Sequence, residues 1–100
     1  MTNVHVIARA VARKGKEDQL RNSLQGMLAP TQAEPGCRLY ELYESGEWGR
    51  FYFYELWENE AALEQHGASP HYKHLELIVR DLLEEPFEVN ILKEVLSLKG

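Results

Sequence analysis

Apolar side chains occupy both sides of one segment of the chain, residues 51–57, which reads FYFYELW. A run of aromatic residues favours a β-strand over a helix. Side chains of a strand alternate between its two sides, and a strand with water on one side would carry polar residues at every second position. We therefore expect this strand to be covered twice, by the chain's own helices on one face and by a second copy of the chain on the other.

Three other segments show the alternation that is typical of strands, at residues 4–13, 37–44 and 87–95. Residues 45–49 contain two glycines, which predicts the turn of a hairpin leading into the aromatic strand. The pattern therefore predicts four strands, the second and third of them joined directly.

The remaining segments carry apolar residues every three to four positions, which is typical of amphipathic helices. The first helix is expected to begin at Lys16 and to end before the Glu-Pro-Gly sequence at 34–36. Pro30 should kink it or end its first part, because proline has no N–H to donate. Residues 59–67 and 69–83 predict a short and a longer helix, since each begins with a residue suited to an N-cap.

The order strand, helix, strand, strand, helix pair, strand is a βαββαβ pattern. It predicts an α+β fold of the ferredoxin-like type, with a four-stranded antiparallel sheet and helices on one face. Residues 1–100 are enough for one domain with a single core. Two such sheets packed face to face would give a homodimer, the dimeric α+β barrel.

Composition narrows the classes of partner. The formal net charge is −5 and no basic stripe is present, so nucleic acid and anionic membrane are not expected partners. No apolar run approaches the length that spans a bilayer. Cys37 is the only cysteine, so no internal disulfide can form; a packing role for Cys37 and a cytoplasmic location are expected.

Glu55 is the first candidate for chemistry, because it shares one face of the aromatic strand with Phe53 and Trp57. A carboxylate on such a face must pair, accept hydrogen bonds or stay protonated. The alternative to a functional role is an ion pair with an arginine of a neighbouring strand, namely Arg9, Arg13 or Arg38.

Two histidines follow as candidates for a base. His66 lies on the inner side of the short helix, where a hydrogen-bonded core histidine is the alternative. His71 falls in the first turn of the next helix, where the helix dipole favours the neutral, proton-accepting imidazole; simple exposure is its alternative. His66, His71 and His74 together suggest a metal site, but their spacing lacks the pattern of known zinc motifs and we expect no metal.

Four aromatic residues are candidates for the walls of a substrate pocket, although each would serve equally well in a core; they are Tyr40, Phe53, Trp57 and Tyr72. The sequence contains no Gly-rich phosphate loop, no nucleotide-binding fingerprint and no defensible Ser/His/Asp order. No flavin, nicotinamide or other cofactor is therefore expected.

Four short motifs together closely resemble the antibiotic biosynthesis monooxygenase domain family, which includes small quinol monooxygenases and the enzyme that processes phosphorylated autoinducer-2. The motifs are Glu-Pro-Gly-Cys at 34–37 with Tyr40, Tyr-Glu-Leu-Trp at 54–57, Ala-Leu at 62–63 with His66, and Ser-Pro-His-Tyr-Lys at 69–73. The resemblance implies a dimeric ferredoxin-like barrel with a pocket between sheet and helices. For many members it also implies oxygenation of a phenol or hydroquinone without metal or organic cofactor.

On this hypothesis His66 or His71 is the base and Glu55 holds the substrate or the imidazole. Trp57, Tyr72 and Phe53 would be walls and proton donors. Haem-degrading relatives have an asparagine, a tryptophan and a histidine where this chain has Ala8, His66 and Glu76, so haem degradation is not expected.

Two alternatives to a cofactor-independent monooxygenase remain. The run Pro-His-Tyr-Lys at 70–73 suggests isomerisation of a phosphorylated, autoinducer-like signal, for which Lys73 is the one nearby cation that we identify. A non-catalytic module that binds a small ligand in the same pocket is the other.

Overall fold

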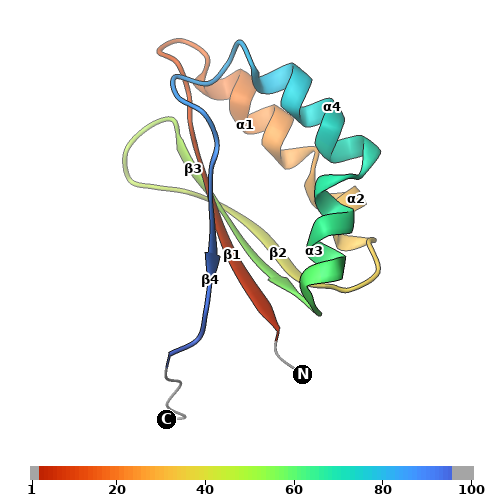
Figure 1. The fold of residues 1–100 in the computed structure, drawn as a ribbon. Coiled ribbons are helices and arrows are strands. Elements are labelled where there is room, and N and C mark those ends of the chain that lie inside the picture. The colour runs from red at the N-terminus through yellow and green to blue at the C-terminus, as the bar shows by residue number, and fades with distance from the viewer. Residues whose placement is uncertain (1–2, 96–100) are drawn as a thin grey trace.

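The structure, a computed structural model, describes residues 3–95 of the chain. Along the chain its elements are β1 (Val4–Val11), α1 (Glu17–Gln25), α2 (Leu28–Gln32), β2 (Cys37–Glu44), β3 (Arg50–Trp57), α3 (Glu60–Gly67), α4 (Pro70–Val79) and β4 (Glu88–Leu92). This order confirms the predicted α+β fold of the ferredoxin-like type (Figure 1). None of the helices that the structure describes has the length and apolar character needed to cross a bilayer.

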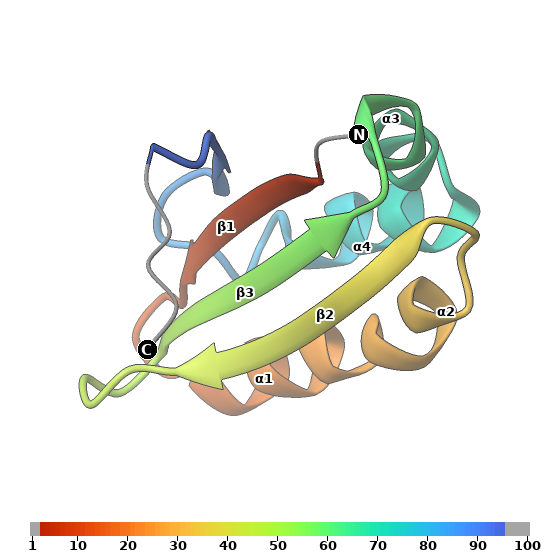
Figure 2. The same ribbon diagram turned by 90° about the horizontal axis from the view of Figure 1, so that it is seen from below.

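The sheet has the strand order β2-β3-β1-β4, and every neighbouring pair is antiparallel. All the helices lie against the same side of it, as Figures 1 and 2 show from two directions. In the register of the strands, Glu55 of β3 lies opposite Val6 of β1 and Tyr40 of β2. Glu55 is therefore in the middle of the sheet, on the face that the helices cover.

The core lies between this inner face and the helices. Phe51, Phe53 and Trp57 of β3 are buried in it, as the alternation of residues 51–57 predicted. Leu20 of α1 and Leu75 of α4 pack against them; burying a side chain of this size contributes roughly 1.5–3 kcal/mol. The outer face of β3 is only half-buried in the single chain, so its cover by a second copy stays a prediction.

The predicted first helix is two helices, and the break lies at Gly26 and Met27, ahead of Pro30. Glycine weakens a helix by about 1 kcal/mol, and the Met27 N–H bonds the carbonyl of Leu24, three residues back. Pro30 is the third residue of α2, where a missing N–H costs nothing because the first turn of a helix has no intrahelical acceptor for it.

The last strand is shorter than predicted. Residues 87–95 alternate in the sequence, but β4 covers Glu88–Leu92 only. Among the described strands its one neighbour is β1, and their pairing ends where His5 faces Leu92. The partner strand, not the local pattern, therefore sets the length of β4.

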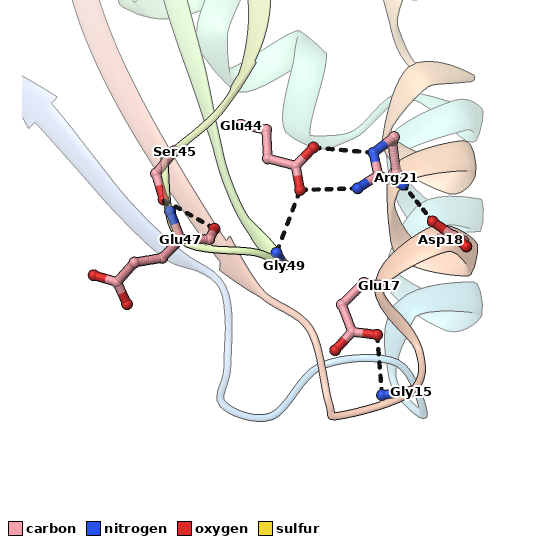
Figure 3. A network of polar contacts seen from close by, with 8 residues as sticks. All are labelled: Gly15, Glu17, Asp18, Arg21, Glu44, Ser45, Glu47 and Gly49. Atoms are coloured by element: carbon pink, nitrogen blue, oxygen red, sulfur yellow. Dashed lines mark hydrogen bonds and ion pairs between the residues drawn. The ribbon is translucent and has the colours of Figure 1, made fainter.

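Polar contacts tie the hairpin between β2 and β3 to α1 (Figure 3). Arg21 donates two hydrogen bonds to the Glu44 carboxylate and one to Asp18. The Gly49 N–H also donates to Glu44, and the Arg21 guanidinium lies 4.6 Å from the centre of the Trp48 ring. These contacts are at the start of β3, whereas the candidates Glu55 and Trp57 are near its end.

Candidate functional site

A cavity of about 260 Å³ lies between the inner face of the sheet and helices α3 and α4. Its walls are mainly apolar and include Val6, Ala8, Phe53, Leu63, Leu75 and Phe87. Its outer wall is formed by Ile91 of β4, which is 65% exposed. A dry cavity of about 150 Å³ already accepts benzene in another protein, so this one has room for a compound of one or two rings.

Glu55 lines the cavity and is 4% exposed. The indole Nε1 of Trp57 donates a hydrogen bond of 2.9 Å to its Oε1. Burial raises the pKa of Glu55 to about 7; the Trp57 bond opposes the rise, and the nearby charge of Glu34 adds to it. The site therefore contains a carboxylic acid that is neutral between about pH 4.5 and 7, where a surface glutamate is ionised.

The arginine partner that the sequence suggested for Glu55 is not formed among the described residues. Alternation along β1 puts Arg9 on the outer face of the sheet, where it pairs with Glu85 and Glu88. Arg38 pairs with Glu58, and Arg13 donates to a backbone carbonyl. The ion-pair interpretation was therefore wrong. Arg9 lies on the opposite face of the sheet, Arg38 stands at a register shift in β2, and Arg13 lies beyond the end of β1.

His66 of α3 is 3% exposed and also lines the cavity. Its Nδ1 lies 2.7 Å from Oε2 of Glu34; a carboxylate can only accept, so Nδ1 carries a proton that it donates. The other ring nitrogen, Nε2, has no partner within residues 3–95 and is left for the cavity. Burial lowers the pKa of His66, the Glu34 carboxylate opposes this, and the charge of His71 adds to it.

His71 contacts the same carboxylate from the other side. Its Nε2 lies 2.6 Å from Glu34 Oε2, and its side chain is 23% exposed. It does not line the cavity; together with His74 it lines a separate groove between α1 and α4. His71 therefore reaches the cavity only through Glu34 and His66.

Glu34 is the site residue that the sequence reasoning missed, because its position before Pro-Gly suggested only the end of a helix. The turn after it approaches α3 closely: Gly36 has φ +84°, and a Cβ there would lie 2.7 Å from that of Ala62. This close approach brings the Glu34 carboxylate to His66. The signal available in the sequence was the Glu-Pro-Gly-Cys motif itself.

The three groups Glu34, His66 and His71 have potential ligand atoms within 4.8 Å of one another, near enough to hold a divalent cation. The set differs from the one suggested by the sequence, because His74 is not part of it. Metal-bound histidines almost always donate their other ring N–H to a carboxylate or carbonyl. Neither His66 Nε2 nor His71 Nδ1 has such a partner in the described part of the chain, and hydrogen bonding to Glu34 accounts for the cluster.

Three of the four aromatic candidates line the cavity. The Tyr40 ring stacks on Phe53 with centroids 4.8 Å apart, and the Tyr72 ring lies 5.2 Å from that of His66. Burial raises the pKa of Tyr40 and of Tyr72, so both hydroxyls keep their protons. Trp57 is fully buried behind the wall, where it contacts Glu55 and the His66 ring.

The family model described as "Antibiotic biosynthesis monooxygenase" matches residues 3–76. A Mycobacterium tuberculosis protein named "Putative monooxygenase Rv0793" is 42% identical over 89 residues, which is 89% of this chain and 88% of that protein. Its solved structure has a TM-score of 0.90 at 38% identity and covers 98% of this chain and 100% of that one. The crystal structure of PA3566 from Pseudomonas aeruginosa also has a TM-score of 0.90, at 29% identity, over 96% of this chain and 97% of that one.

Proposed function

The chain belongs to the antibiotic biosynthesis monooxygenase family, and we propose that it oxygenates a small phenol- or hydroquinone-like compound bound in the cavity. On this proposal the reaction needs neither a metal nor an organic cofactor. The supporting observation is the pair formed by His66 and Glu34, in which the carboxylate holds Nδ1 and Nε2 is left for the cavity.

This pair suits a general base. Its imidazole is fixed in one tautomer, and the carboxylate stabilises the imidazolium that forms when Nε2 takes up a proton. The proton comes from a substrate hydroxyl, and the resulting phenolate donates an electron to dioxygen. The apolar walls of the cavity favour recombination of the two radicals over escape into water.

A phosphorylated substrate suits the cavity poorly. Among the described residues its lining includes no lysine or arginine, and Lys73 is exposed outside it. Glu55 would have to face the phosphate, and both groups carry negative charge when ionised. The isomerase alternative is therefore disfavoured, whereas a non-catalytic module that binds an uncharged ring would fit the same walls.

The proposal includes a homodimer formed through the uncovered face of the sheet. That face carries apolar and aromatic side chains that are half-buried in the single chain, namely Ile7, Leu39, Tyr52, Tyr54 and Leu56. A patch of this kind on a small domain marks an interaction surface. A second copy of the same sheet would cover it and form the α+β barrel.

Dioxygen uptake with a panel of hydroquinones and phenols tests the proposal, after subtraction of autoxidation. We expect the wild-type protein to accelerate uptake and His66→Ala to lose about 100-fold or more of that rate, since a general base contributes 10²–10⁴-fold. The matched control is His74→Ala, outside the Glu34 cluster. No acceleration with any compound would contradict the monooxygenase proposal and leave the binding module; full activity of His66→Ala would remove His66 from the mechanism.

A further inference from the structure

Glu55 lines the cavity, whereas Glu34 does not, and Glu55 takes no part in holding His66. Its Oε1 is fixed by Trp57, and its Oε2 has no hydrogen-bond partner in residues 3–95. Since the side chain is 4% exposed and lines the cavity, Oε2 is available to a bound ring.

We propose that Glu55 is the acid of this site, which protonates the terminal oxygen of a substrate peroxide and then removes the hydrogen of the same carbon. This inference rests on the proposed function and adds a catalytic residue to it. It follows from the position of Glu55 against the cavity and from the lack of any cation beside it among residues 3–95.

The surroundings of Glu55 favour its neutral form. The groups that face it are the indole of Trp57, the Tyr40 and Tyr72 rings, and the more distant Glu34 carboxylate. None of these is a cation. His66 lines the same cavity, and burial favours its neutral form before substrate binds. An ionised carboxylate buried without a counter-ion is strongly disfavoured. The raised pKa of Glu55, about 7, agrees with this geometry.

The acid and the base both contact the indole of Trp57. Trp57 donates to Glu55 through Nε1, and its ring lies 4.7 Å from that of His66. One fully buried side chain thus contacts both groups, and both line the cavity. A neutral base and a neutral acid that face the same small cavity, with pKa values moved by their surroundings, form an acid–base pair.

The proton and electron balance closes with these two groups. His66 Nε2 takes the hydroxyl proton of a phenol, and one-electron transfer followed by radical recombination adds dioxygen to a ring carbon that bears hydrogen. Glu55 protonates the terminal peroxide oxygen, and its carboxylate then removes the proton of that carbon. The C–H electron pair becomes the second C–O bond, while the O–O pair leaves with hydroxide.

Hydroxide takes the proton held by His66 and becomes water. Phenol and dioxygen thus give quinone and water, dioxygen is the oxidant, and both residues return to their starting states. Without the acid, the peroxide anion has no donor at this step, and the expected outcome is loss of superoxide or hydrogen peroxide back into solution.

The test is Glu55→Gln, which keeps the size of the side chain and an acceptor for Trp57 but has no proton to give. Quinone, hydrogen peroxide and superoxide are measured per dioxygen consumed, with a phenol that the wild-type protein oxidises. We expect wild type to form about one quinone per dioxygen and Glu55→Gln to form at least 10-fold less, with the reduced oxygen species released instead. Glu55→Asp should restore part of the yield, and Glu64→Gln, on an exposed site of α3, should equal wild type.

Binding of a non-oxidisable phenol analogue separates this role from a structural one, because Glu55→Gln should bind it as wild type does. A wild-type quinone yield in Glu55→Gln would overturn the inference. So would a loss of all dioxygen uptake with analogue binding intact, since Glu55 would then act before dioxygen. If the wild-type protein itself shows no dioxygen uptake, the proposed function fails and this inference fails with it. If His66→Ala abolishes uptake but Glu55→Gln still forms one quinone per dioxygen, the proposed function stands and the role of Glu55 alone is overturned.

Discussion

Replacing Glu55 by glutamine should stabilise the protein at neutral and alkaline pH but not at acid pH. The side chain is buried against Trp57 and apolar walls. Folding therefore raises the pKa of this carboxyl group from 4.5 to about 7. Glutamine has nearly the shape of the neutral acid and its carbonyl can accept the Trp57 bond, so the folded structure should tolerate it.

The size and the pH window follow from that shift. Below about pH 4.5 the carboxyl group of Glu55 is neutral in both the folded and the unfolded chain, so its burial does not lower the free energy of unfolding. Between 4.5 and about 7 the unfolded chain ionises while the folded one keeps its proton, so stability falls as pH rises; above 7 the loss is complete. At about 1.4 kcal/mol for each pKa unit, the shift corresponds to roughly 3 kcal/mol. Glu55→Gln removes this loss.

The window to cover runs from about pH 4.5 to 7. Guanidinium chloride denaturation of both proteins at about pH 4.5, 6 and 8 would measure the difference in unfolding free energy across it. Protein concentration must be equal, because a dimer is stabilised by mass action. We expect no difference at the acid end and about 3 kcal/mol in favour of Glu55→Gln at the alkaline end. Glu64→Gln, at an exposed site, should show no such trend. If the difference in unfolding free energy between Glu55→Gln and wild type did not change with pH, Glu55 would not be a neutral carboxylic acid in the folded protein. Its proposed role as the acid would then be refuted as well.

Three further changes test the site, the turn beside it and the uncovered face. Glu34→Gln removes the negative charge that is hydrogen-bonded to His66 Nδ1. The value of kcat/KM should therefore fall about 10- to 100-fold, as expected for about 1.5–3 kcal/mol from a charged hydrogen bond. Gly36→Ala introduces a Cβ 2.7 Å from that of Ala62 at φ +84°, and denaturation should show a loss of about 2–4 kcal/mol. Ile7→Glu puts a charge on the uncovered face of the sheet. Sedimentation velocity should then detect monomers, and far-UV circular dichroism should show unchanged helix content.

Each change has a control or a contradicting result. Unaltered kinetics of Glu34→Gln would show that its carboxylate does not support the base. Gly49→Ala has the same backbone requirement, φ +85°, but its one close contact would be with the flexible side chain of Glu17, at 2.8 Å, while the Ala12 Cβ would lie at an ordinary 3.5 Å. Its loss should be smaller, and equal losses would contradict the packing argument at Gly36. A dimer that survives Ile7→Glu would place the interface elsewhere.

The sequence predicted the fold well because the main signals are local. Asn59 and Ser69 cap α3 and α4 as expected, each accepting a hydrogen bond from a backbone N–H of the first turn. Alternation in residues 51–57 identified the inner face of β3. The predicted end of α1 was wrong because the helix ends at Gly26, and the spacing of apolar residues does not show the helix stability lost at a glycine. The predicted length of β4 was wrong because it depends on pairing with β1.

The site was less predictable, since its groups come from distant parts of the chain. His66 and Glu55 stood out as polar residues on apolar faces. Their partners did not, because Glu34 is 32 residues from His66 and 37 from His71 in sequence. Only the packing of the 34–36 turn against α3 reveals which imidazole the carboxylate meets.

The charge of Glu34 acts on both halves of the proposed acid–base pair. It raises the pKa of His66 against the lowering effect of burial, and it adds to the effect of burial in raising the pKa of Glu55. The neutral base defines the acid limb of a bell-shaped pH profile and the neutral acid defines the alkaline limb. Glu34→Gln should therefore move both limbs to lower pH and translate the profile, whereas a carboxylate that served His66 alone would move the acid limb only and widen it.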